Sequence, residues 1–168
     1  LEQEVSRLKG EPEPPAETEI NLALPAHIPA SYIEDGRERL RYYKALTSAQ
    51  DGPGREEVAL AMRDRFGQFP EEMRTFLAVL DFKQFLGELE VEKADIMPQA
   101  IKLVWRKDQK AIAPENIAAV AGEHPQIRLI PPAALSLPLD KSISAAEALK
   151  EARAILSGLV KQPAAPQA

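Results

Sequence analysis

Leu60-Ala61-Met62-Arg63-Asp64-Arg65-Phe66-Gly67-Gln68-Phe69-Pro70 is the stretch that decides the fold of this chain. It predicts the end of one helix and the start of the next. Gly67 can adopt the left-handed conformation that follows a last helical turn, and Pro70 suits the first position of a new helix. Because so few residues separate the two helices, we expect a short and rigid joint between them.

Apolar residues on either side of this stretch recur at helical spacing. Val58, Met62 and Phe66 predict a helix over 55–66 whose inner side lies in the core. The helix that follows, over 70–90, is apolar around most of its circumference, and such a helix is normally buried by other elements. We therefore expect this second helix to lie at the centre of the fold.

The rest of the chain predicts one more helix before the joint and a small sheet after it. Asp35 can cap a helix over 35–50, and Asp51-Gly52-Pro53-Gly54 has the composition of a turn. Apolar patterns and prolines predict the other elements: strands over 18–24, 92–97, 99–106 and 127–130, an edge strand over 135–139 weakened by Pro138, and helices over 115–122 and 144–160. This order predicts an α+β fold, with a helix-rich N-terminal half packed on a small mixed or antiparallel sheet and a closing C-terminal helix.

Composition limits the classes of function. The chain has 168 residues, a net charge of -5 and no cysteine, which excludes disulfides, thiolate metal sites and a cysteine nucleophile. The negative charge disfavours a nucleic-acid backbone as the main partner, although a local basic patch stays possible. No apolar run reaches the roughly 20 residues that span a bilayer. We expect no membrane partner and a cytoplasmic location.

The two ends of the chain differ from its middle. Residues 1–10 have helical spacing, and we expect them to be the end of a preceding domain. The proline-rich and acidic segment 11–17 predicts a semi-rigid linker. The domain itself is expected over 18–160, and the Pro/Ala segment 161–168 is expected to be a disordered tail.

The sequence shows no arrangement typical of catalysis or of cofactor binding. His27 and His124 are the only histidines, and phosphate-binding glycine loops and the Gly-x-Ser-x-Gly elbow are absent. Glu71, Glu72 and Asp64 could be read as paired carboxylates for acid–base work, but Glu71 and Glu72 are acids at the start of a predicted helix, where such residues need no catalytic role. We predict no catalytic, metal-binding or cofactor-binding residue.

Several motifs together resemble a known family. They are Pro25-Ala26-His27-Ile28-Pro29-Ala30-Ser31-Tyr32-Ile33, Arg39-Leu40, Tyr42-Tyr43-Lys44, the run Arg63-Asp64-Arg65-Phe66-Gly67-Gln68-Phe69-Pro70, and Leu77, Leu80 and Lys83. This combination resembles the C-terminal domain of bacterial transcription-repair coupling factor. The resemblance covers about 19–160, with 90–139 matching only in pattern. It also makes 1–10 resemble the end of the helicase-motor domain that precedes this domain in the family.

The resemblance implies a role inside a larger protein. Proteins of this family are ATP-driven DNA translocases that displace stalled RNA polymerase and recruit the damage-recognition protein of excision repair. ATP and magnesium belong to motor domains that are absent from this chain. The resemblance implies that the C-terminal domain is regulatory and not an enzyme. It would pack on the N-terminal excision-helicase-like module, mask the surface that binds the damage-recognition protein, and restrain the motor.

The same resemblance singles out candidate partner-binding residues near the joint. The hypothesis is that Asp64, with Glu57 or Glu71 nearby, presents negative charge to basic residues of the N-terminal module, with Arg63 and Arg65 as further candidates. The family pattern commonly has an acid one turn before Asp64, where this chain has Ala61. The alternative is that Asp64 is simply a solvated residue near a helix end.

Two other functions stay open from the sequence. An accessory nucleic-acid-binding module is suggested by two groups of basic residues, Arg37, Arg39, Arg41 and Lys44, and Arg63 and Arg65. An unrecognised hydrolase would need catalytic turnover that depends on Asp64. Duplex DNA binding and ATP or nuclease turnover distinguish these alternatives from a protein-interaction domain.

Overall fold

The computed structural model describes residues 17–160, so the segments predicted over 1–10 and 161–168, and the linker apart from Glu17, lie outside the described residues. The described elements follow one another in an α+β order. They are β1 (Glu19–Leu22), α2 (Gly36–Ser48), α3 (Gly52–Phe66), α4 (Glu71–Glu88), β2 (Val91–Ile96), β3 (Ala100–Trp105), α5 (Pro114–Glu123), β4 (Arg128–Ile130), β5 (Ala134–Pro138), α6 (Ala145–Leu156) and a 3-10 turn, η1 (Ser157–Leu159). The predicted α+β class is confirmed.

The five described strands form one mixed sheet in the order β1-β2-β3-β5-β4. β1 runs parallel to β2, and every other neighbouring pair is antiparallel. The prediction of an edge strand over 135–139 is wrong, because β5 lies between β3 and β4. Pro138 is tolerated there because it is the last residue of β5, where it pairs with Ala100 at the start of β3.

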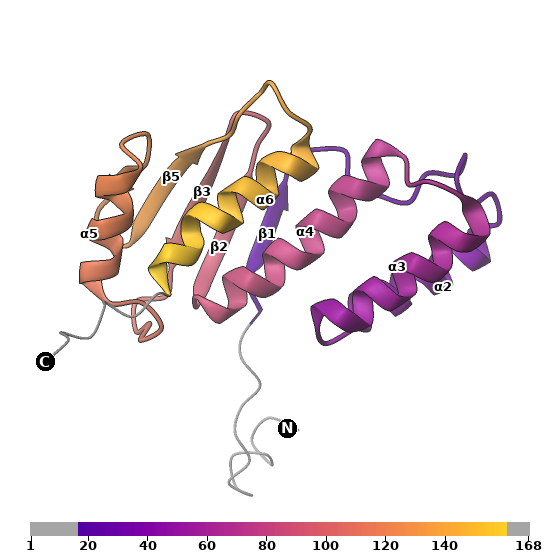
Figure 1. The fold of residues 1–168 in the computed structure, drawn as a ribbon. Helices are drawn as coiled ribbons and strands as arrows, with labels where there is room; N and C mark the ends of the chain where they lie inside the picture. The colour runs from indigo at the N-terminus through magenta and orange to yellow at the C-terminus, as the bar shows by residue number, and fades with distance from the viewer. Residues whose placement is uncertain (1–16, 161–168) are drawn as a thin grey trace, which may run out of the picture.

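One face of the sheet is covered by two helices that lie side by side, α4 and α6 (Figure 1). α2 and α3 pair with each other and lie beyond α4, on the side away from α6, while α5 lies near β5 at the other end. The opposite face of the sheet carries a polar row. One row of paired residues crosses all five strands there: Asn21, Asp95, Lys102, Ser136 and Arg128.

The apolar side chains form two clusters that α4 joins. The larger cluster lies between the sheet and the helices α4, α5 and α6, and includes Phe82, Leu86 and Leu103. The smaller lies among α2, α3 and the first turns of α4, and includes Leu46 and Met62. Since α4 contributes side chains to both clusters, apolar residues are needed around most of its circumference. The helix is buried by other elements, as the sequence predicts. No described helix has the length and apolar character needed to cross a membrane.

Asp51-Gly52-Pro53-Gly54 is not the turn that its composition predicts. It is the start of α3: the Asp51 side chain accepts a hydrogen bond from the Gly54 backbone N–H at 2.7 Å, and Pro53 lies in the first helical turn. Proline is tolerated in a first turn, where backbone N–H groups have no helical partner. The predicted cap Asp35 is confirmed for α2, and of the two serines that could cap the last helix, Ser142 and Ser144, the N-cap of α6 is Ser144.

Candidate docking site

The joint between α3 and α4 is held by a tyrosine from the loop after β1. The phenol of Tyr32 donates to the Gly67 carbonyl oxygen at 2.7 Å, and lies 3.3 Å from the Met62 carbonyl oxygen. Its ring packs against Phe66 and Phe69, with ring centroids 5.7 and 6.1 Å apart. Burial raises the pKa of the Tyr32 phenol above its usual value, an effect that the nearby Arg63 charge partly offsets.

Gly67 allows the sharp exit from α3. Its φ of 92° lies in the region that residues with a side chain rarely adopt, and its N–H donates to the Arg63 carbonyl oxygen at 2.9 Å. Pro70 is the N-cap of α4, one residue before the first helical position that the sequence predicts for it. The predicted joint is therefore confirmed, and it fixes where the last turn of α3 points.

The outer side of α3 carries two acids around an exposed leucine. Glu57, Leu60, Ala61 and Asp64 are all exposed, and spacings of three, four and seven residues place them on one side of the helix. Leu60 is 42% exposed, which is unusual for a large apolar side chain in this domain. We call this set the α3 face.

The carboxylates of Asp64, Glu57 and Glu71 make no hydrogen bond or ion pair with any residue of the described part of the chain. Asp64 and Glu57 lie together on the α3 face, whereas Glu71 is the first residue of α4, beyond the joint. The structure therefore brings two of the three predicted acids onto one helix surface and leaves both available to a partner.

The two predicted arginines have different surroundings. Arg63 is exposed and lies close enough to Tyr32 to influence its pKa. Arg65 instead forms an ion pair with Glu38 of α2, and its guanidinium lies 4.9 Å from the centroid of the Phe66 ring. Glu38 was not predicted as a site residue, because no sequence spacing shows that the ends of α2 and α3 meet.

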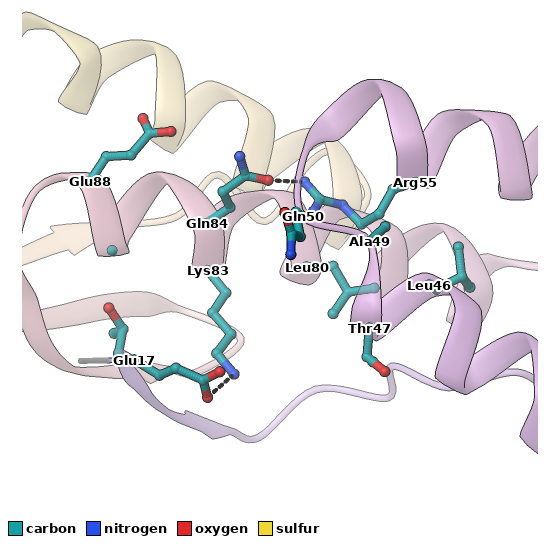
Figure 2. A pocket seen from close by; sticks show the side chains of 12 residues that line it. Glu17, Leu46, Thr47, Ala49, Gln50, Arg55, Leu80, Lys83, Gln84 and Glu88 are labelled. Carbon is teal, nitrogen blue, oxygen red and sulfur yellow. Dashed lines mark hydrogen bonds and ion pairs between the residues drawn. The ribbon is translucent and has the colours of Figure 1, made fainter. Parts of the chain in front are cut away.

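A groove lies between the start of β1, the turn joining α2 and α3, and one side of α4 (Figure 2). Its volume is about 470 Å³. At one end Lys83 pairs with Glu17, with Nζ 3.5 Å from a carboxylate oxygen. At the other end Arg55, which is almost fully buried, donates to the Gln84 side-chain oxygen at 2.6 Å. These polar side chains are paired with one another and form no nucleophile–base arrangement.

The described residues also contain no cluster of three or more His, Asp or Glu side chains that could hold a metal ion. His27 lies in the loop after β1, and His124 follows α5. Asp81 links three helices: from α4, its carboxylate contacts Arg55 of α3 at 3.5 Å and Arg153 of α6 at 2.9 Å. These ion pairs hold the helices together and form no catalytic arrangement.

A family model supplies the deciding comparison. The model for the TRCF domain matches residues 22–117, which include the α3 face, the joint and all of α4. The chain belongs to the TRCF domain family. The predicted resemblance is confirmed on the residues that suggested it. The TRCF domain match ends inside α5, so β4, β5 and α6 lie beyond it.

Curated relatives and a solved structure agree with this assignment. The chain is similar to transcription-repair-coupling factors of Bacillus subtilis (32% identity) and Escherichia coli (34% identity), over 56% of the chain in each case. The matched part makes up only 8% and 9% of those two proteins. In fold, the TRCF domain is similar to a crystal structure of the C-terminal domain of transcription-repair coupling factor, with a TM-score of 0.67 and 18% identity, covering 86% of this chain and 94% of that one.

Proposed function

We propose that this TRCF domain is a non-catalytic regulatory domain that docks through its α3 face onto the N-terminal excision-helicase-like module of a longer protein. In the docked state it would cover the surface that binds the damage-recognition protein and would restrain the motor. Binding of RNA polymerase would favour release. The domain itself would use no cofactor, because ATP and magnesium belong to the motor domains.

The observation that carries this proposal is the pair of unengaged carboxylates, Asp64 and Glu57, on either side of the exposed Leu60. An acidic surface with an apolar centre fits a basic partner surface that also offers an apolar contact. Ala61 lies between the two acids and has a small side chain, so it lets a partner approach the helix closely. The Tyr32 contacts hold the end of α3 and so hold Asp64 in a fixed direction.

The expected strength of the contact through the α3 face suits a domain that must both dock and be released. An exposed ion pair contributes at most about 1 kcal/mol. Burying much of one leucine side chain adds roughly 1–2 kcal/mol. Two ion pairs and this apolar contact would therefore supply a few kcal/mol, which is enough to favour a closed state and little enough for a second partner to open it.

Charge reversal in the intact parent protein tests the proposal. Asp64→Arg should weaken the closed state, so ATPase activity and affinity for the damage-recognition protein should both rise, by up to about tenfold for a loss of 1.4 kcal/mol. Asp108→Arg is the matched control, since Asp108 is an exposed aspartate in the turn after β3. If Asp64→Arg and Asp108→Arg leave both activities unchanged, the α3 face is not the docking surface.

A second measurement addresses the partner directly. The 168-residue chain should bind the separately produced N-terminal module, and the complex should weaken with salt because its ion pairs are exposed. Leu60→Ser tests the apolar part of the contact without changing the charge of the α3 face. Undiminished binding by both Asp64→Arg and Leu60→Ser would exclude this face as the contact.

The structure bears on the nucleic-acid alternative. Arg39 donates to the backbone carbonyl oxygens of Ile33 and Glu34 at 2.8 and 3.2 Å. Arg41 and Arg65 both pair with Glu38. Three of the six predicted basic residues therefore contact groups within the domain, although Arg41 and Arg65 remain largely exposed. Tight and steeply salt-dependent binding to duplex DNA would favour the alternative. Turnover of ATP or of a nucleic acid by the 168-residue chain, abolished by Asp64→Ala, would instead show an enzyme.

A further inference from the structure

The outer side of α2 forms a second charged surface, opposite in sign to the α3 face. Arg37, Leu40, Arg41 and Lys44 are all exposed, and their spacing places them along one side of the helix. Leu40 is 54% exposed, the largest value among the exposed large apolar side chains of residues 17–160. The surface is therefore a basic strip with an apolar residue near its centre.

A cavity of about 330 Å³ continues this strip to the end of α3. Its lining combines three arginines and two acids: Asp35, Arg37, Glu38, Arg41 and Arg65. The Glu38 side chain is only 13% exposed and pairs with the guanidinium groups of Arg41 and Arg65, while most of each arginine remains in solvent. Glu38 thus draws two exposed guanidinium groups together at one end of the strip.

We propose that this α2 strip binds an acidic amphipathic helix of a partner protein. Arg37 and Lys44 are separated by seven residues, a rise of about 10 Å along α2. A helix laid along the strip with carboxylates at positions i, i+4 and i+7 can reach the cations of the strip, and a leucine at i+3 can cover Leu40. The guanidinium groups of Arg41 and Arg65 are forked donors, which suit carboxylates particularly well.

Two features favour a protein over a nucleic acid. Asp35 and Glu38 line the cavity among the arginines, so the positive charges are interrupted by negative ones; carboxylates placed at separate points along a helix can avoid Asp35 and Glu38, whereas a continuous phosphate backbone cannot. A backbone of phosphates and sugars also makes little use of an exposed leucine, whereas burial of Leu40 would strengthen contact with an apolar side chain. The strip lies on α2 and does not depend on the α3 face, so the two proposals can fail separately.

The test uses a labelled synthetic helical peptide of about 16 residues. It carries glutamates at i, i+4 and i+7 around a leucine at i+3, and its binding to the 168-residue chain is followed by fluorescence anisotropy and by amide chemical shifts. We expect the shifts to centre on α2. Arg37→Glu combined with Lys44→Glu should weaken binding by about tenfold, since two attractive charge pairs with the peptide become repulsive. Leu40→Asp should also weaken it.

The controls distinguish binding at the α2 strip from non-specific electrostatic attraction of the peptide to the domain. Lys141→Glu combined with Lys150→Glu reverses two exposed lysines, one just before α6 and one on it, and so changes the net charge by the same amount; this variant should bind the peptide as tightly as the unaltered chain. The substitutions on α2 affect exposed side chains and leave Glu38 in place, so the fold should be retained, as circular dichroism would verify. Equal binding by the α2 and α6 variants would overturn the proposal. So would tighter binding of duplex DNA to the same residues, or dimerisation of the chain through the strip.

Discussion

The phenol oxygen of Tyr32 lies 2.7 Å from the carbonyl oxygen of Gly67, across 35 residues of sequence. This hydrogen bond joins the loop after β1 to the residue that ends α3. It satisfies a carbonyl group at a helix end, where the backbone has no helical partner. Tyr32 therefore connects two of the motifs by which the family was recognised, and it does so through a single atom.

Tyr32→Phe should lower the free energy of unfolding by about 1 kcal/mol, because the ring contacts with Phe66 and Phe69 remain and only the hydrogen bond is lost. Urea unfolding at neutral pH measures this loss. Tyr42→Phe is the matched control: Tyr42 also packs on Phe66, at 5.7 Å, but its hydroxyl makes no hydrogen bond within residues 17–160. Equal losses for the two variants would contradict the assigned role of the Tyr32 hydroxyl.

The Tyr32 phenol also predicts a loss of stability at alkaline pH. Its pKa in the folded domain is raised above 10.0, so the folded state favours the neutral, hydrogen-bonding form. The corresponding stabilisation is complete below pH 10.0 and is lost as the pH rises through the folded-state pKa. Unfolding free energies measured from neutral pH to above pH 10.0 should fall in the unaltered chain, and Tyr32→Phe should lack this component of the fall.

Two glycines should respond to alanine in opposite directions. A Cβ on Gly158 would lie 2.8 Å from Cγ2 of Val120, where η1 approaches α5, so Gly158→Ala should destabilise the domain by about 1–2 kcal/mol. A Cβ on Gly122 would meet nothing within 4 Å, and Gly122 is helical. Gly122→Ala should therefore stabilise α5 by up to about 1 kcal/mol. Thermal unfolding of the two variants measures both signs, and a stabilising Gly158→Ala would show that η1 can move away from α5.

Glu90 should give a definite order of stability among its variants. Its φ is 58°, and its carboxylate accepts hydrogen bonds from the backbone N–H groups of Lys110 and Ala111 at 2.5 and 3.0 Å. Glu90→Ala keeps the unfavourable φ and loses both bonds, which should cost about 2–4 kcal/mol. Glu90→Gly loses the same bonds but removes the backbone strain, because glycine adopts a positive φ readily. Its free energy of unfolding should therefore be about 1 kcal/mol higher than that of Glu90→Ala. The opposite order in urea unfolding would refute this account.

Asp81 should contribute to stability through both of its arginines. It contacts the almost fully buried Arg55 at 3.5 Å and the half-exposed Arg153 at 2.9 Å. Asp81→Asn should cost about 1–2 kcal/mol, most of it from Arg55, which would keep only Gln84 as a partner. A double-mutant cycle with Arg153→Leu should give a coupling of at most about 1 kcal/mol, since that pair is in contact with solvent. A larger coupling would mean that water has less access to the Asp81–Arg153 pair than its exposure in the structure indicates.

The sequence was most informative where one residue has only one structural use. Gly67 and Pro70 predicted the joint, because a left-handed exit and a proline start exclude most alternatives. Asp51 and Pro53 were misread, because residues that favour turns also favour the first turn of a helix. Pro138 suggested an edge, since its position at the very end of β5 could not be known before the strands were paired.

The candidate surfaces also combine features that the sequence predicts with features that it does not. Glu57 and Asp64 are seven residues apart, and helical spacing is enough to place them on one face. The pairing of Arg65 with Glu38, and of Asp81 with Arg153, joins residues from different helices. Such contacts depend on how helices pack, and spacing within one helix carries no information about them. The left-handed Glu90 was also beyond prediction, because local sequence favours no positive φ at a glutamate.

The parallel pairing of β1 with β2 has a consequence for the order of assembly on the ribosome. The hydroxyl of Thr18, just before β1, donates to the Val91 carbonyl oxygen, 73 residues later in the chain. β1, the first strand of residues 17–160, therefore has no partner until α2, α3, α4 and β2 have left the exit tunnel. Until then the backbone of β1 and the side chain of Ile20 are uncovered, a state in which nascent chains are prone to wrong associations. Closing so long a loop has an entropic cost, which slows folding more than it lowers the stability of the native state.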